Sequence, residues 1–247
     1  MLALFTIAHP LVDACSLSVL IAGGMSWQRV VAYNAMAFAL QLPMGLIADE
    51  RPGWVRGGFF LGTGMAVAAA VAAAFGAHGW GVLAVACVGN ALFHLTAGKE
   101  ILDTRGGRGG PIGLFISTGA LCLLAGRIGM ERCAAAALPA FAAALAVVSV
   151  ASAVRWRKAI HGSSAAATGE ASPILESLML FGLFVLVAWR SWAGLAAGRI
   201  SAGQGAALLF VAQLATGPVL SLLYDRTGRC GGMAFGLNCL GLFAGSL

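Results

Sequence analysis

Long apolar stretches recur along the whole chain, separated by short segments that hold glycine or charged residues. Nine such stretches can be read, at residues 2–22, 29–48, 57–77, 81–97, 111–130, 134–154, 174–194, 205–224 and 231–247. Most approach the length of about 20 residues that an α-helix needs to cross a hydrocarbon core about 30 Å thick. The pattern predicts an all-α protein, a polytopic transmembrane helical bundle.

The longest polar interruption lies at residues 155–172 and is rich in small and polar residues. Such a composition is typical of a flexible linker. The predicted organisation is an N-terminal six-helix transmembrane bundle at 1–154, a cytoplasmic linker at 155–172, and a partial C-terminal transmembrane bundle of three helices at 173–247.

Composition supports the membrane class, because 60% of the residues are hydrophobic and only 10% are charged. Soluble domains carry about 25% charged residues. The net charge of +6 does not indicate nucleic-acid binding, since the basic residues form no patch with interleaved aromatics. Four His and six Cys show no metal-ligand spacing along the chain, so the sequence predicts no metal and no cofactor.

The basic residues predict an orientation. On the predicted topology, 10 of the 15 Lys and Arg residues fall on one side: Arg51, Arg56, Lys99, Arg105, Arg108, Arg155, Arg157, Lys158, Arg226 and Arg229. By the positive-inside rule this side is cytoplasmic. We therefore expect a multi-pass protein of the inner (plasma) membrane with a cytoplasmic N-terminus.

A short motif occurs twice, at the end of the second and of the eighth stretch. The first copy contains Gly45, Asp49 and Arg56, and the second contains Asp225, Arg226, Gly228 and Arg229. Glycine permits a tight turn here, and the carboxylate can cap the next helix or pair with arginine.

These two copies resemble the loop motif of the major facilitator superfamily, which lies between spans two and three and between spans eight and nine. Ser221 replaces the leading Gly of the second copy, and in the first copy Glu50 replaces Arg and Gly53 is one position late. Gly110, Pro111, Gly113 and Gly119 are similar to the family's Gly/Pro-rich fifth helix. The resemblance implies a secondary transporter, with the motif in a gating-loop role, although that family has twelve spans and this sequence has nine.

Polar residues inside the predicted spans are the candidate transport residues, because an ionisable group within a bilayer usually faces a cavity or a partner. We expect coupling or substrate roles for His9, Asp13, His94 and Arg190, and cavity positions for Tyr33, Asn34, Gln41, Asn90 and Gln213. The resemblance implies that spans one, four and seven line a central cavity. The first, fourth and seventh stretches do hold the ionisable residues His9, Asp13, His94 and Arg190.

Alternatives stay open for each residue. Asp13 is either a proton- or cation-coupling carboxylate or a neutral partner for a neighbouring helix, and His9 either shares its proton or bonds a backbone carbonyl. His94 lies toward the cytoplasmic end of its stretch. It either has a substrate or coupling contact or makes a structural bond, for example with the expected loop 98–110. Arg190 either snorkels to the interface or binds an anionic group.

The leading functional interpretation is a secondary active transporter of a small solute, embedded in membrane lipid, with protons as the coupling ion. The solute would be anionic or zwitterionic if Arg190 faces the cavity. The alternatives are a non-transporting membrane scaffold and an incomplete fragment of a transporter. A membrane-embedded enzyme is disfavoured, because the sequence has no H-E-x-x-H, G-x-S-x-G or P-loop motif.

Overall fold

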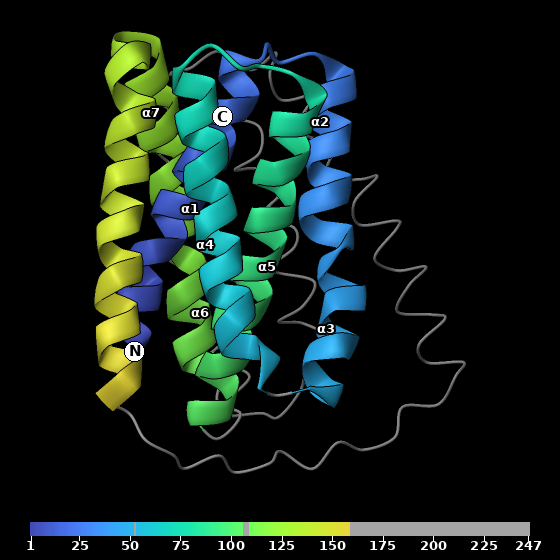
Figure 1. Cartoon of the computed structure of the whole chain (residues 1–247), viewed down its shortest axis with the longest axis vertical. Coiled ribbons are helices and arrows are strands. Elements are labelled where there is room, and N and C mark those ends of the chain that lie inside the picture. The colour runs from blue at the N-terminus through green and yellow to red at the C-terminus, as the bar shows by residue number, and fades with distance from the viewer. Residues whose placement is uncertain (52, 106–108, 159–247) are drawn as a thin grey trace.

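The computed structural model describes residues 1–51, 53–105 and 109–158, and all regular structure in these ranges is helical (Figure 1). The elements in chain order are α1 (Leu2–Ala22), α2 (Trp27–Asn34), the π-helix η1 (Ala35–Ala39), α3 (Gln41–Glu50), α4 (Trp54–Ala74), α5 (Trp80–Thr104), α6 (Gly109–Ser117) and α7 (Gly119–Lys158). The all-α prediction is confirmed for this part of the chain. The linker was predicted to begin at residue 155, but residues 155–158 are the last turn of α7. The rest of the predicted linker and the C-terminal bundle lie outside the described residues.

Four helical segments are long and apolar enough to cross a membrane, namely Leu2–Ala22, Trp54–Ala74, Trp80–Thr104 and Ala136–Trp156. They correspond to the predicted first, third, fourth and sixth spans, so the prediction of membrane-spanning helices is confirmed at this level. Ala136–Trp156 is the least buried of the four, whereas α1 and α5 are the most buried. The centre of the bundle is therefore formed largely by α1 and α5.

The predicted second and fifth spans are interrupted. The second is formed by α2, η1 and α3 in succession, and the fifth by α6 and the first part of α7, with Thr118 as the break. In the second, Gln41 Nε2 donates to the carbonyl oxygen of Ala37 in η1, at 2.9 Å. This bond satisfies a backbone acceptor where the helix departs from regular α geometry.

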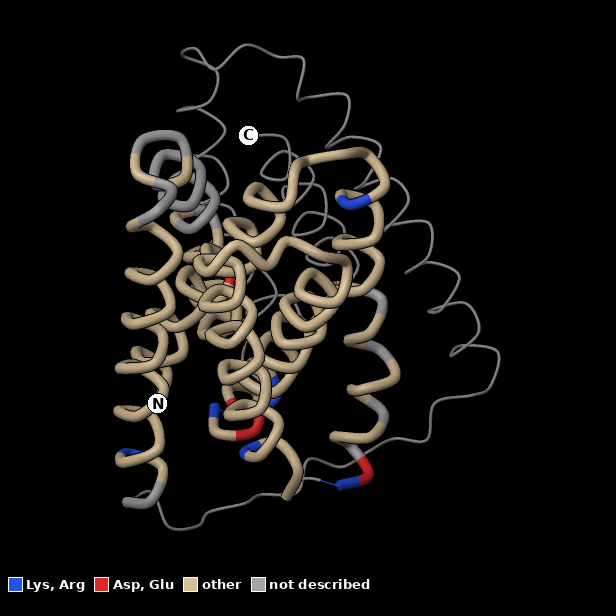
Figure 2. Tube along the Cα trace, turned by 45° about the horizontal axis from the view of Figure 1, so that its top comes forward, with Lys and Arg blue, Asp and Glu red and all other residues tan. Residues whose placement is uncertain are grey.

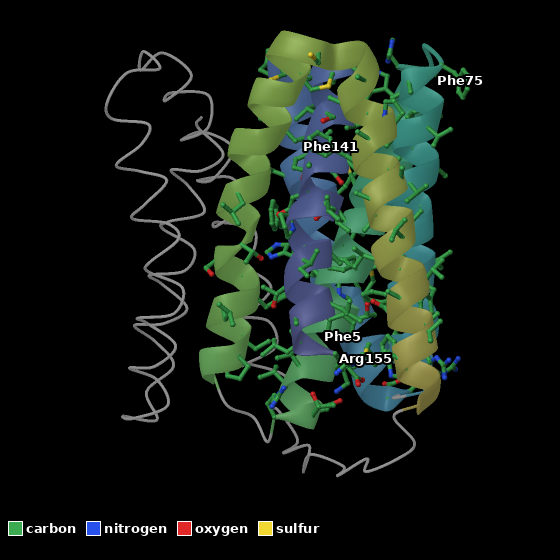
Figure 3. All side chains as sticks on the ribbon, turned by 90° about the vertical axis from the view of Figure 1, so that its left-hand side faces the viewer. Phe5, Phe75, Phe141 and Arg155 are labelled. Atoms are coloured by element: carbon green, nitrogen blue, oxygen red, sulfur yellow. The ribbon has the colours of Figure 1, made fainter. Side chains whose placement is uncertain are left out.

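The element α7 reverses direction near Cys133, whose backbone is non-helical (φ −147°, ψ 48°). Its ribbon rises on one side of α1, crosses the end of the bundle and descends on the other side (Figure 3). The predicted division between the fifth and sixth spans is therefore present, although the helical turns continue almost through it.

The helix α5 extends further than predicted, because the expected loop at 98–110 is helical as far as Thr104. Its last turns are polar, and Lys99 Nζ lies 3.8 Å from Asp103 Oδ2, an i,i+4 pair of the kind that supports a helix. The extension places His94 well inside the helix rather than near its end.

Glycine lets α4 and α5 approach closely. A Cβ atom on Gly62 would lie 2.7 Å from the backbone nitrogen of Phe93, and one on Gly89 would lie 2.8 Å from the carbonyl oxygen of Gly62. Small residues at such positions permit backbone contact between membrane helices. This contact fixes the depth and rotation of α5 beside α4.

Aromatic side chains join α1, α4 and α7 near the end where the chain begins. The ring of Trp156 lies 5.5 Å from Phe5 and 5.5 Å from Phe59, centroid to centroid, in edge-on geometry. Phe5 and Phe59 are fully buried. The second arm of α7 is therefore held against the core by a large apolar contact.

Charged residues gather at the same end of the bundle (Figure 2). Arg51, Arg56, Lys99, Arg105 and Arg155 lie at or next to the ends of α3, α4, α5 and α7 that meet there. At the opposite end, Arg29 donates to the carbonyl of His78 and lies 5.3 Å from the centre of the Trp80 ring. The described part thus carries more basic residues at this end of the bundle than at the opposite end.

Candidate functional site

Four polar side chains from α1 and α5 meet inside the apolar bundle. Asp13 is at the centre: its Oδ1 accepts from Asn90 Nδ2 at 2.8 Å, its Oδ2 lies 3.1 Å from His9 Nε2, and its Oδ1 lies 3.4 Å from His94 Nε2. The i,i+4 spacing within each pair, His9 with Asp13 and Asn90 with His94, puts both members on one helix face. We call these four residues the α1–α5 cluster.

His9 is oriented by the broken fifth stretch. Its Nδ1 lies 2.6 Å from the carbonyl oxygen of Phe115, in the last turn of α6, and its ring stacks on the Phe115 ring at 4.6 Å. Carbonyls in the last turn of a helix have no intrahelical partner, so they are available to other donors. The break at Thr118 thus provides the acceptor that fixes the His9 ring.

His94 is oriented by its own helix, since its Nδ1 lies 2.9 Å from the carbonyl oxygen of Asn90. A carbonyl oxygen only accepts, so the hydrogen of each neutral imidazole is placed on Nδ1. The lone pair of both rings is then on Nε2, directed at the carboxylate of Asp13. The two rings are 4.5 Å apart and nearly perpendicular.

Asn90 is almost fully buried, and its Oδ1 finds no hydrogen-bond donor among the described residues. Its Nδ2 is 3.5 Å from Ser16 Oγ in addition to the bond with Asp13. Buried amide oxygens are normally satisfied, and an orphaned one requires a donor, water or a cation nearby. The cluster therefore has an unused acceptor next to its carboxylate.

The first residue of α7 closes the cluster. A Cβ on Gly119 would lie 3.0 Å from Asp13 Oδ2 and 3.0 Å from His9 Cε1. Next to it, Thr118 Oγ1 donates to the carbonyl oxygen of Thr6 at 3.0 Å or to that of Phe115 at 2.8 Å. Glycine at 119 leaves room for the contact between His9 and Asp13.

One carboxylate and two imidazoles in contact can hold protons or a metal cation. Among the described residues, His9, Asp13 and His94 form a group of potential metal-ligand atoms that all lie within 4.8 Å of one another. All three residues were expected to serve coupling or substrate roles, but their direct contact could not be read from the sequence, because His9 and His94 belong to different helices.

The other predicted cavity residues on described helices, Tyr33, Asn34 and Gln41, lie on the interrupted second span rather than on α1 or α5. Asn34 is buried at the end of α2, and Tyr33 packs against a small core formed with Leu20, Leu83 and Cys87. The side chain of Gln41 donates a hydrogen bond to the backbone of η1, one turn earlier in the same interrupted span. Arg190 and Gln213 lie outside the described residues.

The first copy of the gating-loop motif is described in part. A Cβ on Gly45 would be in ordinary contact with Leu95 of α5 at 3.5 Å, and the exposed Arg56 lies 6.0 Å from the centre of the Trp156 ring. The side chain of Asp49 is not described. The second copy, with Asp225, Arg226, Gly228 and Arg229, lies outside the described residues.

Sequence reasoning missed Ser16 and Thr118 as partners of the cluster, and it noted Gly119 only as part of a Gly/Pro-rich helix. Ser16 lies three residues after Asp13, which places it on the same face of α1 and was a usable signal. The break at Thr118 has no comparable signature. The loop expected from residue 98 was wrong, because α5 continues to Thr104, so the bonds of His94 are made within α5 and to α1 rather than within a loop.

A scan against protein-family models finds no match for this chain, and a search of curated proteins finds no significant similarity.

Proposed function

We propose that this chain is a secondary active membrane transporter that moves a small solute by alternating access, with protons carried by the α1–α5 cluster. The observation that supports this most strongly is the convergence of Asp13, His9 and His94 inside helices apolar enough to cross a membrane. A charged residue at the centre of a membrane helix costs about 2.5–3.5 kcal/mol or more. Residues retained at that cost usually serve an ion or substrate path.

The interrupted helices support the same proposal. Transporter sites are commonly built beside discontinuous helices, whose unpaired backbone groups contact ions or substrates. Here the break at Thr118 exposes a carbonyl to His9, and η1 packs against α5, the helix that carries Asn90 and His94. π-Helical turns are also frequent at functional sites.

The proposal includes a major-facilitator-like architecture, an inner-membrane location and a cytoplasmic N-terminus. The repeated Gly-Asp-Arg motif supports the architecture, and the basic residues at one end of the bundle support the orientation. An anionic or zwitterionic solute would depend on Arg190, which lies outside the described residues.

The test begins with a solute library screened for thermal stabilisation of the purified protein. Each stabilising solute is then offered, in labelled form, to liposomes that contain the protein, with and without an imposed pH gradient. We expect at least one solute to accumulate above the level in empty liposomes when the gradient is present. If no stabilising solute enters the liposomes beyond this level, the transporter proposal is wrong.

Matched variants then test the role of Asp13. Asp13→Asn should abolish accumulation driven by the pH gradient but retain exchange of solute across the membrane. Asp103→Asn is the control, because Asp103 is in the polar end of α5 and pairs with Lys99 rather than with the cluster. Equal loss of accumulation in both variants would remove Asp13 from the coupling role.

A further inference from the structure

We propose that His9 Nε2, the carboxylate of Asp13 and His94 Nε2 form a binding site for one divalent first-row transition-metal cation of the class of Zn²⁺ or Co²⁺. The inference goes beyond the transport proposal and does not depend on it, because a metal can bind in this bundle whether or not a solute is carried.

The first support is the direction of the lone pairs. Both Nδ1 atoms are used by backbone carbonyls, of Phe115 at 2.6 Å and of Asn90 at 2.9 Å. Each neutral ring therefore turns its Nε2 lone pair toward a carboxylate oxygen, and lone pairs facing each other repel. The arrangement requires a positive centre between these atoms, either a proton or a cation.

The second support is the fit of distances. Two ligand atoms bound tetrahedrally to one Zn²⁺ at about 2.0–2.2 Å lie roughly 3.3–3.6 Å apart. The Nε2 atoms of His9 and His94 lie 3.1 Å and 3.4 Å from the Asp13 oxygens. All three ligand atoms lie within 4.8 Å of one another, so they surround one position that a cation could occupy.

The third support is the set of groups behind the ligands. Metal-binding histidines usually donate their second ring N–H to a carbonyl or carboxylate, and metal-binding carboxylates are themselves hydrogen-bonded. His9 and His94 have such carbonyls, and Asp13 Oδ1 accepts from Asn90 Nδ2. These contacts fix the tautomer of each ring and the orientation of the carboxylate.

The fourth support is the orphaned Asn90 Oδ1, a buried acceptor in the same cluster that finds no donor among the described residues. A water bound to the cation could donate a hydrogen bond to this oxygen, and three protein ligands with water in the remaining position are typical of open metal sites. Imidazole and carboxylate together favour Zn²⁺ and its neighbours over hard cations such as Mg²⁺.

Metal and protons compete for the same atoms. Metal binding requires neutral imidazoles and an ionised carboxylate, and it releases any protons these groups hold. The titratable groups in the contacts described above are His9, Asp13 and His94, while Asn90, Ser16, Thr118 and the Phe115 carbonyl do not titrate.

The test is a titration of the full chain, purified without a polyhistidine tag, with CoCl₂ and then ZnCl₂. We expect visible d–d absorption typical of Co²⁺ with few ligands, at one Co²⁺ per chain, and its loss when Zn²⁺ is added. Calorimetry in buffers of different ionisation enthalpy should show proton release on binding.

Variants locate the site. His94→Gln and Asp13→Asn should each weaken Co²⁺ binding at least roughly tenfold. His78→Gln, in an exposed loop, should leave it unchanged. If Asp13→Asn does not fold, His94→Gln alone decides, because His94 is only partly buried. A parent chain that binds neither metal, or an affinity unchanged in His94→Gln, would overturn the proposal.

Discussion

Asp13 is the residue whose burial most needs compensation. Its side chain is 19% exposed in the bundle, and its oxygens are contacted by one amide and two imidazoles. Breaking a buried ionic contact by removing one partner costs about 3–5 kcal/mol, because the remaining charge is left uncompensated. The residues that form the cluster therefore also hold α1 against α5, so a substitution that changes the cluster without removing a partner complements Asp13→Asn and His94→Gln.

Gly119→Ala is such a substitution. The added Cβ would lie 3.0 Å from both Asp13 Oδ2 and His9 Cε1, which is closer than ordinary contact, so one of these groups must move. Alanine also favours a helix over glycine by about 0.5–1 kcal/mol. We expect Co²⁺ affinity to fall about tenfold, as for other small disturbances of ligand orientation. The thermal unfolding temperature should change little.

Gly98→Ala provides the matched control for Gly119→Ala. Gly98 is also helical, in α5, and a Cβ there meets nothing within 4 Å. Its Co²⁺ affinity should equal that of the parent. An unchanged affinity in Gly119→Ala, measured in the same titration, would show that the contact between His9 and Asp13 tolerates the extra methyl group.

At the scale of the elements, the contact between α4 and α5 determines where the cluster lies. Gly89 is adjacent to Asn90, and its backbone meets that of Gly62. We expect Gly62→Ala to destabilise the protein by about 1–3 kcal/mol, because overpacking forces the helices apart. Thermal unfolding in detergent measures the effect. Gly64→Ala, with nothing within 4 Å of its Cβ, should unfold at the parent temperature or slightly higher.

The helices could largely be predicted from hydrophobicity alone. The boundaries of α1 match the expected stretch, because a predominantly apolar run begins next to Met1 and ends at the glycines after Ala22. The end of α5 could not be predicted in this way, since Lys99, Glu100 and Asp103 look like a loop by composition. They are helical because i,i+4 pairing allows charged residues to continue a helix beyond its apolar part.

The candidate site was predicted in its residues but not in its geometry. His9, Asp13, Asn90 and His94 were all chosen because polar groups inside apolar stretches are costly. Their mutual contacts depend on the rotation of α1 relative to α5, which is fixed by glycine packing with α4 and by the break at Thr118. Neither determinant has a period or spacing that could be read from one sequence.

At the scale of the whole molecule, the two ends of the bundle differ in chemistry. Basic residues gather where α1 begins (Figure 2), and tryptophans lie at both ends, with Trp156 beside Phe5 and Phe59 and with Trp27 and Trp80 exposed at the opposite end. Aromatic rings of this kind are typical of the membrane interface, and an excess of Lys and Arg is typical of the cytoplasmic side. By the positive-inside rule, we expect the end where α1 begins to face the cytoplasm.

Labelling of single cysteines tests this orientation. Gly53, between α3 and α4, and Gly79, before α5, are exposed and have nothing within 4 Å of an added Cβ, so Cys should be tolerated at both. In cells whose native cysteines in this chain are replaced by serine, we expect a membrane-impermeant maleimide to label Gly79→Cys from outside. Gly53→Cys should react only after permeabilisation, because the neighbouring Arg51 and Arg56 belong to the basic end, which the positive-inside rule assigns to the cytoplasm. Labelling of Gly53→Cys in intact cells, with Gly79→Cys protected, would reverse the orientation and with it the direction from which protons or metal reach Asp13.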